Sequence, residues 1–116
     1  MTPEAIEAVK NTDTIVGSGT EATKGALVII KYEGRLENGE IFDSTDLQGR
    51  PFQFVVGSTK VIKGMSQAVL GMREGGKRTS FIPASLAYGE RQVGQKIKPH
   101  SNLIFHIELI ESRPRE

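Results

Sequence analysis

The aromatic side chains are the residues of this sequence best suited by type to form a binding or catalytic site. The chain has five phenylalanines, two tyrosines and no tryptophan. They are Tyr32, Phe42, Phe52, Phe54, Phe81, Tyr88 and Phe105. Around a cavity with a few polar groups, such side chains would bind an apolar ring in a fixed orientation. In a small β-rich domain they can instead form the hydrophobic core, and for the aromatic residues considered alone the core is the favoured interpretation.

Other kinds of site chemistry find little support in the sequence. There is no cysteine, which excludes thiolate catalysis, disulfides and cysteine-based zinc sites. The two histidines, His100 and His106, have no neighbours at a metal-ligand spacing, and we expect His106 to be a solvated surface residue. A serine–histidine–aspartate triad is a spatial arrangement and stays open, although no G-x-S-x-G turn is present to display its serine. We therefore expect neither a metal nor a cofactor.

Two further motifs are better explained as structure than as chemistry. The stretch from Gly17 to Ala22 matches G-x-G-x-x-A, a pattern of dinucleotide sites. Such a site needs a helix opening at the end of the motif, whereas here a β-rich run follows. We interpret the stretch as a glycine-rich turn. The pair Lys77-Arg78 is interpreted as a solvated strand end rather than a phosphate clamp.

Length and charge narrow the class of protein. The chain has 116 residues, enough for one domain with its own core. Its 15 lysines and arginines nearly balance 14 aspartates and glutamates, which argues against a nucleic-acid or anionic-membrane binder. The N-terminal residues lack the pattern of a signal peptide, and no run approaches the roughly 20 apolar residues of a membrane span. We expect a cytoplasmic protein that acts as a monomer.

The periodicity of apolar residues predicts several strands and one helix. The expected strands are a short run at 14–16 and longer ones at 26–36, 40–44, 52–56, 77–82 and 103–110. Asn38-Gly39 marks a tight hairpin turn. Met65, Val69 and Met72 recur at helical spacing and predict a short helix over 63–72. Together these elements indicate an α+β fold, with an antiparallel sheet of about five strands packed on the helix.

Three stretches carry a more specific pattern of aromatic, glycine and proline residues. They are Gly17-x-Gly19 with Gly25, Val28–Gly34 and Leu36–Ser44; Arg50–Gly57 with Val61–Gly64; and Phe81–Gly89 with Ile97–Phe105. In this order, from about Thr14 to Ile110, they resemble the FKBP family of peptidyl-prolyl cis–trans isomerases. The resemblance implies a curled antiparallel sheet wrapped over one short helix. It places an isomerase domain at 13–112, after an N-terminal arm at 1–12 that is flexible or a short helix, and before a C-terminal tail at 113–116.

The resemblance also implies a proline pocket between sheet and helix. Its catalytic residues would be Tyr32, Phe42, Asp43, Ile62, Tyr88 and Phe105, and its further substrate-binding residues would be Phe52, Val61, Met65 and Ile97. The Ile62 N–H would anchor the substrate chain, the Tyr88 hydroxyl would bond a substrate carbonyl, and Asp43 would accept a hydrogen bond from Tyr32. The implied activity is isomerisation of X-Pro bonds in peptides and proteins, which assists folding. The implied inhibitors are macrolides such as tacrolimus and rapamycin.

The sequence departs from the family pattern at four places. Met65 stands where the family usually has the tryptophan of the pocket floor. Gln48 stands where well-studied members carry an arginine near Asp43, residues 90–96 are more polar than usual, and Ser80 occupies a strand position that is often apolar. The Met65 replacement keeps a second interpretation open. In it the domain is a binding module that docks a protein partner through the pocket and the loop at 90–98, with weak or incidental catalysis.

Overall fold

A computed structural model describes residues 8–114 of the chain. The strands are β1 (Lys10–Ile15), β2 (Leu27–Leu36), β3 (Ile41–Ser44), β4 (Phe52–Val55), β5 (Lys77–Ile82) and β6 (Leu103–Arg113). The helices are α1 (Thr45–Gln48), α2 (Lys63–Val69) and a 3-10 turn, η2 (Ala84–Leu86). Every predicted strand and the predicted helix are present, whereas α1 and η2 are too short to leave a periodic signal in the sequence.

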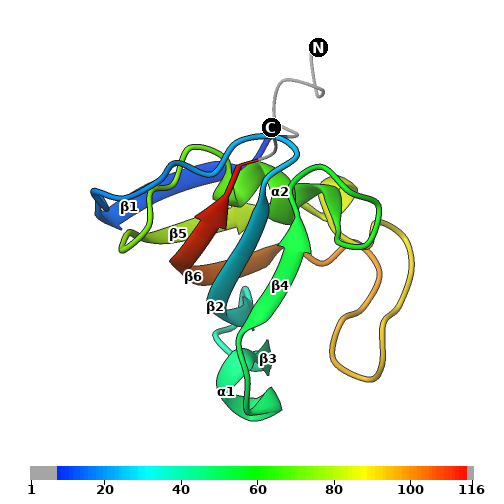
Figure 1. Cartoon of the computed structure of the whole chain (residues 1–116). Coiled ribbons are helices and arrows are strands. Elements are labelled where there is room, and N and C mark those ends of the chain that lie inside the picture. The colour runs from blue at the N-terminus through cyan, green and yellow to red at the C-terminus, as the bar shows by residue number, and fades with distance from the viewer. Residues whose placement is uncertain (1–7, 115–116) are drawn as a thin grey trace.

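The strands form one antiparallel sheet in the order β1-β5-β6-β2-β3, with β4 also paired to β2 (Figure 1). β3 pairs with Glu33–Arg35 and β4 with Leu27–Ile30, while β6 occupies the other edge of β2 along its whole length. β3 and β4 thus share one edge, and the sheet is five strands wide. The predicted fold class is confirmed.

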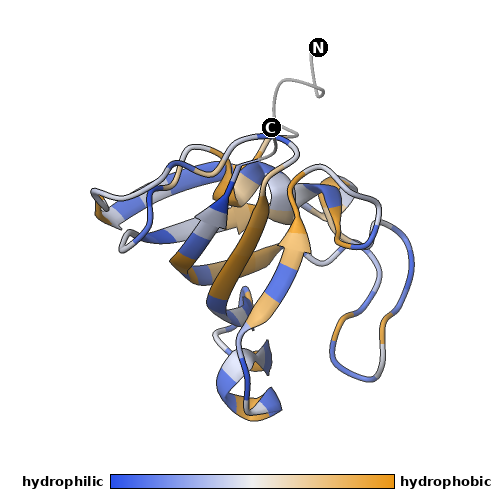
Figure 2. Ribbon diagram, in the orientation of Figure 1, coloured by the Kyte–Doolittle hydropathy of each residue, from blue (hydrophilic) through white to orange (hydrophobic). Residues whose placement is uncertain are grey.

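The hydrophobic core lies between this sheet and α2. In β6 the residues Leu103, Phe105, Ile107 and Leu109 are buried, as their alternation predicts, and His106 is exposed. Figure 2 shows hydrophobic residues along β2, β4 and β6. The buried residues of β6 share one cluster with Met65, Ala68 and Val69 of α2. Each large apolar side chain buried in this way stabilises the fold by about 2 kcal/mol. The core therefore fixes α2 against the sheet.

The hairpin between β2 and β3 forms where Asn38-Gly39 predicts it. Gly39 has a φ of 93°, in the left-handed region that glycine enters without steric cost. The Asn38 side chain accepts a hydrogen bond from the Glu40 N–H at 2.8 Å, and the Leu36 N–H donates to the Glu40 carbonyl at 2.8 Å. This turn sets the register of β3, which carries part of the site.

The helix α2 ends three residues earlier than predicted, at Val69 rather than position 72. Arg78 of β5 donates hydrogen bonds to the carbonyls of Ala68 and Leu70 at 2.8 and 2.9 Å. It also forms an ion pair with Asp13 at 2.6 Å, and only 8% of its surface is exposed. The expectation that Arg78 is solvated is therefore wrong, because it satisfies the last carbonyls of α2.

The N-terminal boundary of the sheet also differs from the expected one. β1 starts at Lys10, so residues 10–12 belong to the sheet rather than to the arm, with Asn11 opposite Ser80. The fully buried Ser80 hydroxyl donates to the Asn11 side chain at 2.6 Å, which satisfies this polar group in the interior. Residues 1–7 of the expected arm and 115–116 of the expected tail lie outside the described residues.

Candidate active site

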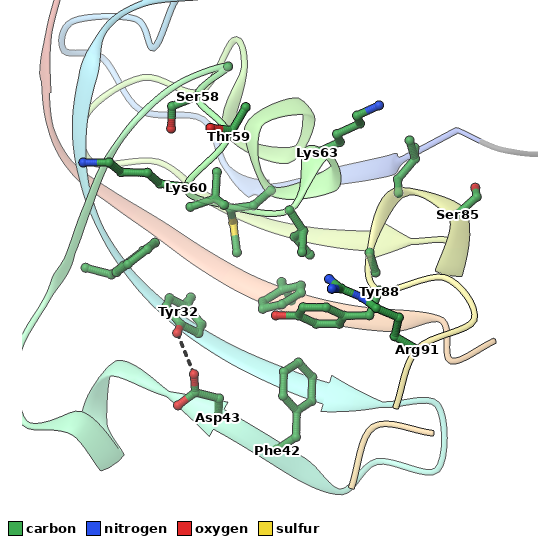
Figure 3. A pocket seen from close by; sticks show the side chains of 18 residues that line it. Tyr32, Phe42, Asp43, Ser58, Thr59, Lys60, Lys63, Ser85, Tyr88 and Arg91 are labelled. Atoms are coloured by element: carbon green, nitrogen blue, oxygen red, sulfur yellow. Dashed lines mark hydrogen bonds between the residues drawn. The ribbon is translucent and has the colours of Figure 1, made fainter. Parts of the chain in front are cut away.

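A half-open cavity of about 610 Å³ lies between the inner face of the sheet, α2 and the loops that flank them (Figure 3). Nine of the expected site residues line it, namely Tyr32, Phe42, Asp43, Phe52, Val61, Ile62, Met65, Tyr88 and Phe105. A pocket of this size accommodates a small molecule or a few residues of a peptide. The sequence therefore brings together, in one cavity, residues that are up to 73 positions apart, from Tyr32 to Phe105.

Edge-to-face contacts between aromatic rings form one wall. The Phe105 ring lies 5.6 Å from Phe42 and 5.7 Å from Tyr32, at interplanar angles of 87° and 63°. Tyr32 continues to Phe52 at 5.8 Å and 79°. Each such pair contributes roughly 0.5–1.5 kcal/mol beyond burial of its area. The contacts hold the rings in one arrangement before any ligand arrives.

A β-bulge turns two neighbouring residues of β3 into the cavity. Side chains of consecutive strand residues normally point to opposite faces, yet both Phe42 and Asp43 line the cavity. Gly34 of β2 lies opposite Asp43, whereas Arg35 lies opposite Ile41, so Phe42 is the additional residue. Bulges commonly redirect side chains in this way near functional sites.

Gly34 makes room for the aromatic wall. A Cβ atom at this position would lie 2.6 Å from Cζ of Phe42 and 2.9 Å from Cε1 of Phe105. Both distances are far below ordinary van der Waals contact. The two rings can therefore pack over β2 only because residue 34 has no side chain.

A small hydrogen-bond network fixes the polar side of the cavity. The Tyr32 hydroxyl donates to Oδ2 of Asp43 at 2.8 Å, as expected. The Gln48 amide donates to both carboxylate oxygens of Asp43 at 3.1 Å and to the Tyr32 hydroxyl at 3.2 Å. The Ser44 N–H adds a bond to Oδ1 at 2.8 Å. Among residues 8–114 no lysine or arginine forms an ion pair with Asp43, so a neutral amide replaces the cation.

The short helix α1 places Gln48 in this network. Its first turn is capped by the Ser44 hydroxyl, which accepts a bond from the Leu47 N–H at 3.0 Å. It ends at Gly49, whose N–H bonds back to the Thr45 carbonyl at 2.9 Å. The capped turn brings Gln48 back beside Asp43, five positions earlier in the chain. The sequence contains these capping residues, but a four-residue helix is too short to predict from periodicity.

Both tyrosines of the cavity hold their protons more tightly than a free tyrosine. Burial, the hydrogen bond to Asp43 and the charge of Asp43 together raise the pKa of Tyr32 from 10.0 to about 12, against a smaller lowering effect of Gln48. Burial and the charge of Asp43 also raise the pKa of Tyr88, against an opposing effect of Arg91. Both hydroxyls are therefore neutral hydrogen-bond donors near neutral pH.

The raised pKa predicts a loss of stability in alkali. Between pH of about 10 and 12 the unfolded chain loses the Tyr32 proton, while the folded chain keeps it. The stabilisation is thus complete below the ordinary pKa and is lost as pH rises through the folded one. In a Tyr88→Phe background, titration of tyrosinate absorbance should place Tyr32 near 12. Asp43→Asn should lower this pKa and Gln48→Ala should raise it, whereas titration near 10 in all three proteins would contradict the network.

The segment before α2 supplies the opposite wall. Ile62 precedes the first helical residue in an extended conformation, and its carbonyl accepts from the Met65 N–H at 3.0 Å. In the part of the chain that the structure describes, the Ile62 N–H donates to no other protein group. Met65 is 4% exposed and lines the cavity from the helix. The geometry leaves the Ile62 N–H available to a ligand.

Ile97 does not line the cavity, although the resemblance implies that it does. It is 5% exposed and belongs to the core cluster. Its backbone pairs with that of Val93, which closes a narrow loop between β5 and β6. Lys96, within this loop, donates to the Ile41 carbonyl at 3.1 Å and forms an ion pair with Glu40 at 3.3 Å. Ile97 thus supports the loop beside the pocket, and its contact with a substrate stays a prediction.

Further residues line the cavity that the sequence did not single out. They are Gly57, Ser58, Thr59, Lys60, Lys63, Ser85, Leu86, Ala87 and Arg91. All are within a few positions of an expected site residue, which is the one signal that could have found them. Among residues 8–114 no group of three or more histidine, aspartate or glutamate side chains could hold a metal ion. No described helix is both long and apolar enough to cross a bilayer.

The sequence of this chain matches a family of known proteins. A family model described as FKBP-type peptidyl-prolyl cis-trans isomerase matches residues 18–110. The chain belongs to this family.

Individual relatives extend the comparison. The chain is 48% identical over 109 residues to the chloroplastic peptidyl-prolyl cis-trans isomerase FKBP13 of Arabidopsis thaliana, covering 84% of this chain and 52% of the relative. It is 47% identical over 102 residues to a 39 kDa FK506-binding nuclear protein of Drosophila melanogaster, covering 87% and 28%. An FK506-binding protein of Neisseria meningitidis is 44% identical over 95 residues, covering 82% and 87%. The chain thus spans about half of the Arabidopsis relative and under a third of the Drosophila one.

Solved structures agree with the fold. The crystal structure of the Arabidopsis FKBP13 has a TM-score of 0.82 at 44% identity, covering 89% of this chain and 91% of that one. A peptidyl-prolyl cis-trans isomerase of Pseudomonas syringae has a TM-score of 0.81 at 33% identity, covering 91% and 76%. The relatives' names refer to the chloroplast and the nucleus, so the expected cytoplasmic location stays a prediction.

Proposed function

We propose that this chain catalyses cis–trans isomerisation of X-Pro bonds in peptides and proteins, and so assists their folding. The observation that carries the proposal is the cavity itself. Its aromatic wall is preorganised by edge-to-face contacts, and the Tyr32 hydroxyl beside this wall is fixed by its hydrogen bond to Asp43. Membership of the FKBP family supports the same activity.

The proposed mechanism removes water from the amide as it twists. An X-Pro bond crosses a barrier of about 20 kcal/mol, which comes from lost amide resonance. Water stabilises the planar form best, because that form has the greater charge separation. A dry aromatic wall removes this stabilisation, and a shape that fits the twisted form favours the transition state. No covalent intermediate is needed.

Polar groups around the wall would hold the substrate in register. The Ile62 N–H would bond the substrate backbone, and the neutral Tyr88 hydroxyl would donate to a substrate carbonyl. Phe42 and Phe105 would surround the proline ring. Asp43 would act through Tyr32, by fixing its hydroxyl and by setting the local field. Macrolides of the tacrolimus and rapamycin type would compete for the same cavity.

The binding-module alternative keeps one observation in its favour. Met65 forms part of the cavity lining without offering a flat ring for a proline to stack on. In that case the pocket and the adjoining loop at 90–98 would dock a protein partner, with incidental catalysis.

An exchange NMR assay on a short X-Pro peptide distinguishes the two functions. Acceleration well above the uncatalysed rate, which is lost in Phe105→Leu, supports an isomerase. A wild-type protein that binds the peptide in a chemical-shift titration but leaves the exchange rate unchanged would be a binding module. Melting temperature of each variant controls for misfolding.

Met65→Trp is expected to increase kcat/KM several-fold and to tighten macrolide binding. A tryptophan would add a rigid apolar surface to the lining, whereas methionine is smaller and flexible. The chain has no tryptophan, so the substituted side chain also reports macrolide binding by its fluorescence. Met65→Leu is the matched control, because it keeps the size without the ring. The idea fails if Met65→Trp leaves both quantities unchanged or lowers both.

A further inference from the structure

Three cationic side chains surround the cavity. Lys60 lies on the segment that leads into α2, Lys63 is the first residue of α2, and Arg91 lies on the loop that follows Tyr88. Figure 3 shows Arg91 beside Tyr88, Lys60 at the far left of the pocket, and Lys63 above it with its amino group pointing outward. All three side chains are exposed. A peptide bound in the pocket would therefore have positive charge on more than one side.

These cations are not neutralised by the protein. None of them takes part in an ion pair among residues 8–114, whereas Arg35, Arg73, Arg78, Lys96 and Arg113 do. Asp43 is the one acidic residue among those that line the cavity. Its carboxylate already accepts hydrogen bonds from Tyr32, Gln48 and the Ser44 N–H. The entrance thus has a local positive excess in a chain whose net charge is only +1.

We propose that Lys60, Lys63 and Arg91 give the site a preference for X-Pro segments with an acidic residue next to the proline. This inference rests on the proposed function and specifies its substrate class. An acidic side chain next to the proline would lie in the positive potential of these cations, while the proline ring packs against the aromatic wall. Surface lysines often serve solubility alone, but such lysines would not make turnover depend on the charge beside the proline.

Matched peptides measure this preference. We would compare capped Ala-Glu-Pro-Phe, Ala-Gln-Pro-Phe and Ala-Lys-Pro-Phe by exchange NMR at low ionic strength. The glutamate peptide should have a kcat/KM about three- to tenfold above its glutamine isostere, and the lysine peptide should fall below it. Salt at about 0.5 M should bring the ratios close to one, because the screening length shrinks to a few ångströms.

Variants that remove positive charge test whether the preference for an acidic residue comes from Lys60, Lys63 and Arg91. In Lys60→Met/Lys63→Met/Arg91→Met the glutamate-to-glutamine ratio should fall to about one. Lys10→Met/Lys31→Met/Lys77→Met removes three cations from exposed positions outside the cavity, and its ratio should match the wild type. Equal changes in both proteins would attribute the effect to net charge and overturn the proposal.

The outcomes separate the inference from the proposed function. Equal turnover of the glutamate and glutamine peptides overturns the inference and leaves the isomerase intact. If no peptide is accelerated, the proposed function fails. A chemical-shift titration with the same peptides then decides the inference, because a cationic entrance must still bind the glutamate peptide more tightly.

Discussion

Asp43→Ala is expected to lower kcat/KM for an X-Pro peptide by about ten- to a hundredfold, while the free energy of unfolding falls by only about 1–2 kcal/mol. The carboxylate holds the Tyr32 hydroxyl at 2.8 Å and accepts two further donors, the Gln48 amide and the Ser44 N–H. Its removal frees the Tyr32 ring and the Gln48 side chain at the edge of the aromatic wall. Asp43 is half-buried and lies outside the core cluster. Its replacement should therefore disorder the side chains of the pocket, and so lower activity, more than it destabilises the fold.

Asp43→Asn divides this effect into charge and geometry. Asparagine has the same shape and can still accept from Tyr32, but it carries no negative charge. A variant with nearly full activity would assign the role of Asp43 to positioning, and one as impaired as Asp43→Ala would assign it to the field. The assay is exchange NMR beside thermal unfolding. If Asp43→Ala lost stability and activity in equal proportion, or kept full activity, the proposed role of this network would be wrong.

The framework of the fold was predictable because it follows from local patterns. The alternation of apolar residues in 103–110 predicted the buried face of β6, and Asn38-Gly39 predicted the hairpin between β2 and β3. What local patterns could not give were contacts made across the chain. Arg78 follows Lys77 at a strand end, which looks solvated, yet it is buried because the carbonyl end of α2 lies against β5. Likewise Ser80 looks like a poor core residue until Asn11 supplies its partner.

The site was predictable in its members but not in its geometry. The resemblance named the residues around the pocket, and the structure places nine of them in one cavity. Strand alternation would have separated Phe42 from Asp43, since only the bulge at Phe42 turns both inward. The role of Gln48 depends on the capped turn of α1, which has no periodic signature. Ile97 was assigned to the pocket from its motif, whereas its burial depends on the path of a loop.

Gly34→Ala is expected to abolish most of the activity without replacing any side chain that would contact the substrate. The new methyl group would lie 2.6 Å from Cζ of Phe42 and 2.9 Å from Cε1 of Phe105, so at least one ring must move. The Phe42 ring is only half-buried and is the freer of the two, because Phe105 is 4% exposed and fixed in the core. Displacement of Phe42 into the cavity would change the shape that fits the twisted amide. We expect kcat/KM to fall about ten- to a hundredfold and stability by about 1–3 kcal/mol.

A double-mutant cycle tests whether the methyl group acts through the Phe42 ring. Phe42→Leu alone should lower activity, because part of the wall is lost. If the clash with Phe42 is the cause, adding Gly34→Ala to Phe42→Leu should cost much less than it costs in the wild type, both in activity and in melting temperature. Fully additive effects would show that Gly34 serves the backbone of β2 rather than the wall. The cycle with Tyr32→Phe provides the control, because Tyr32 also lies on β2 and lines the cavity. There Gly34→Ala should retain its full effect, since the three atoms nearest to the new methyl group belong to Phe42 and Phe105.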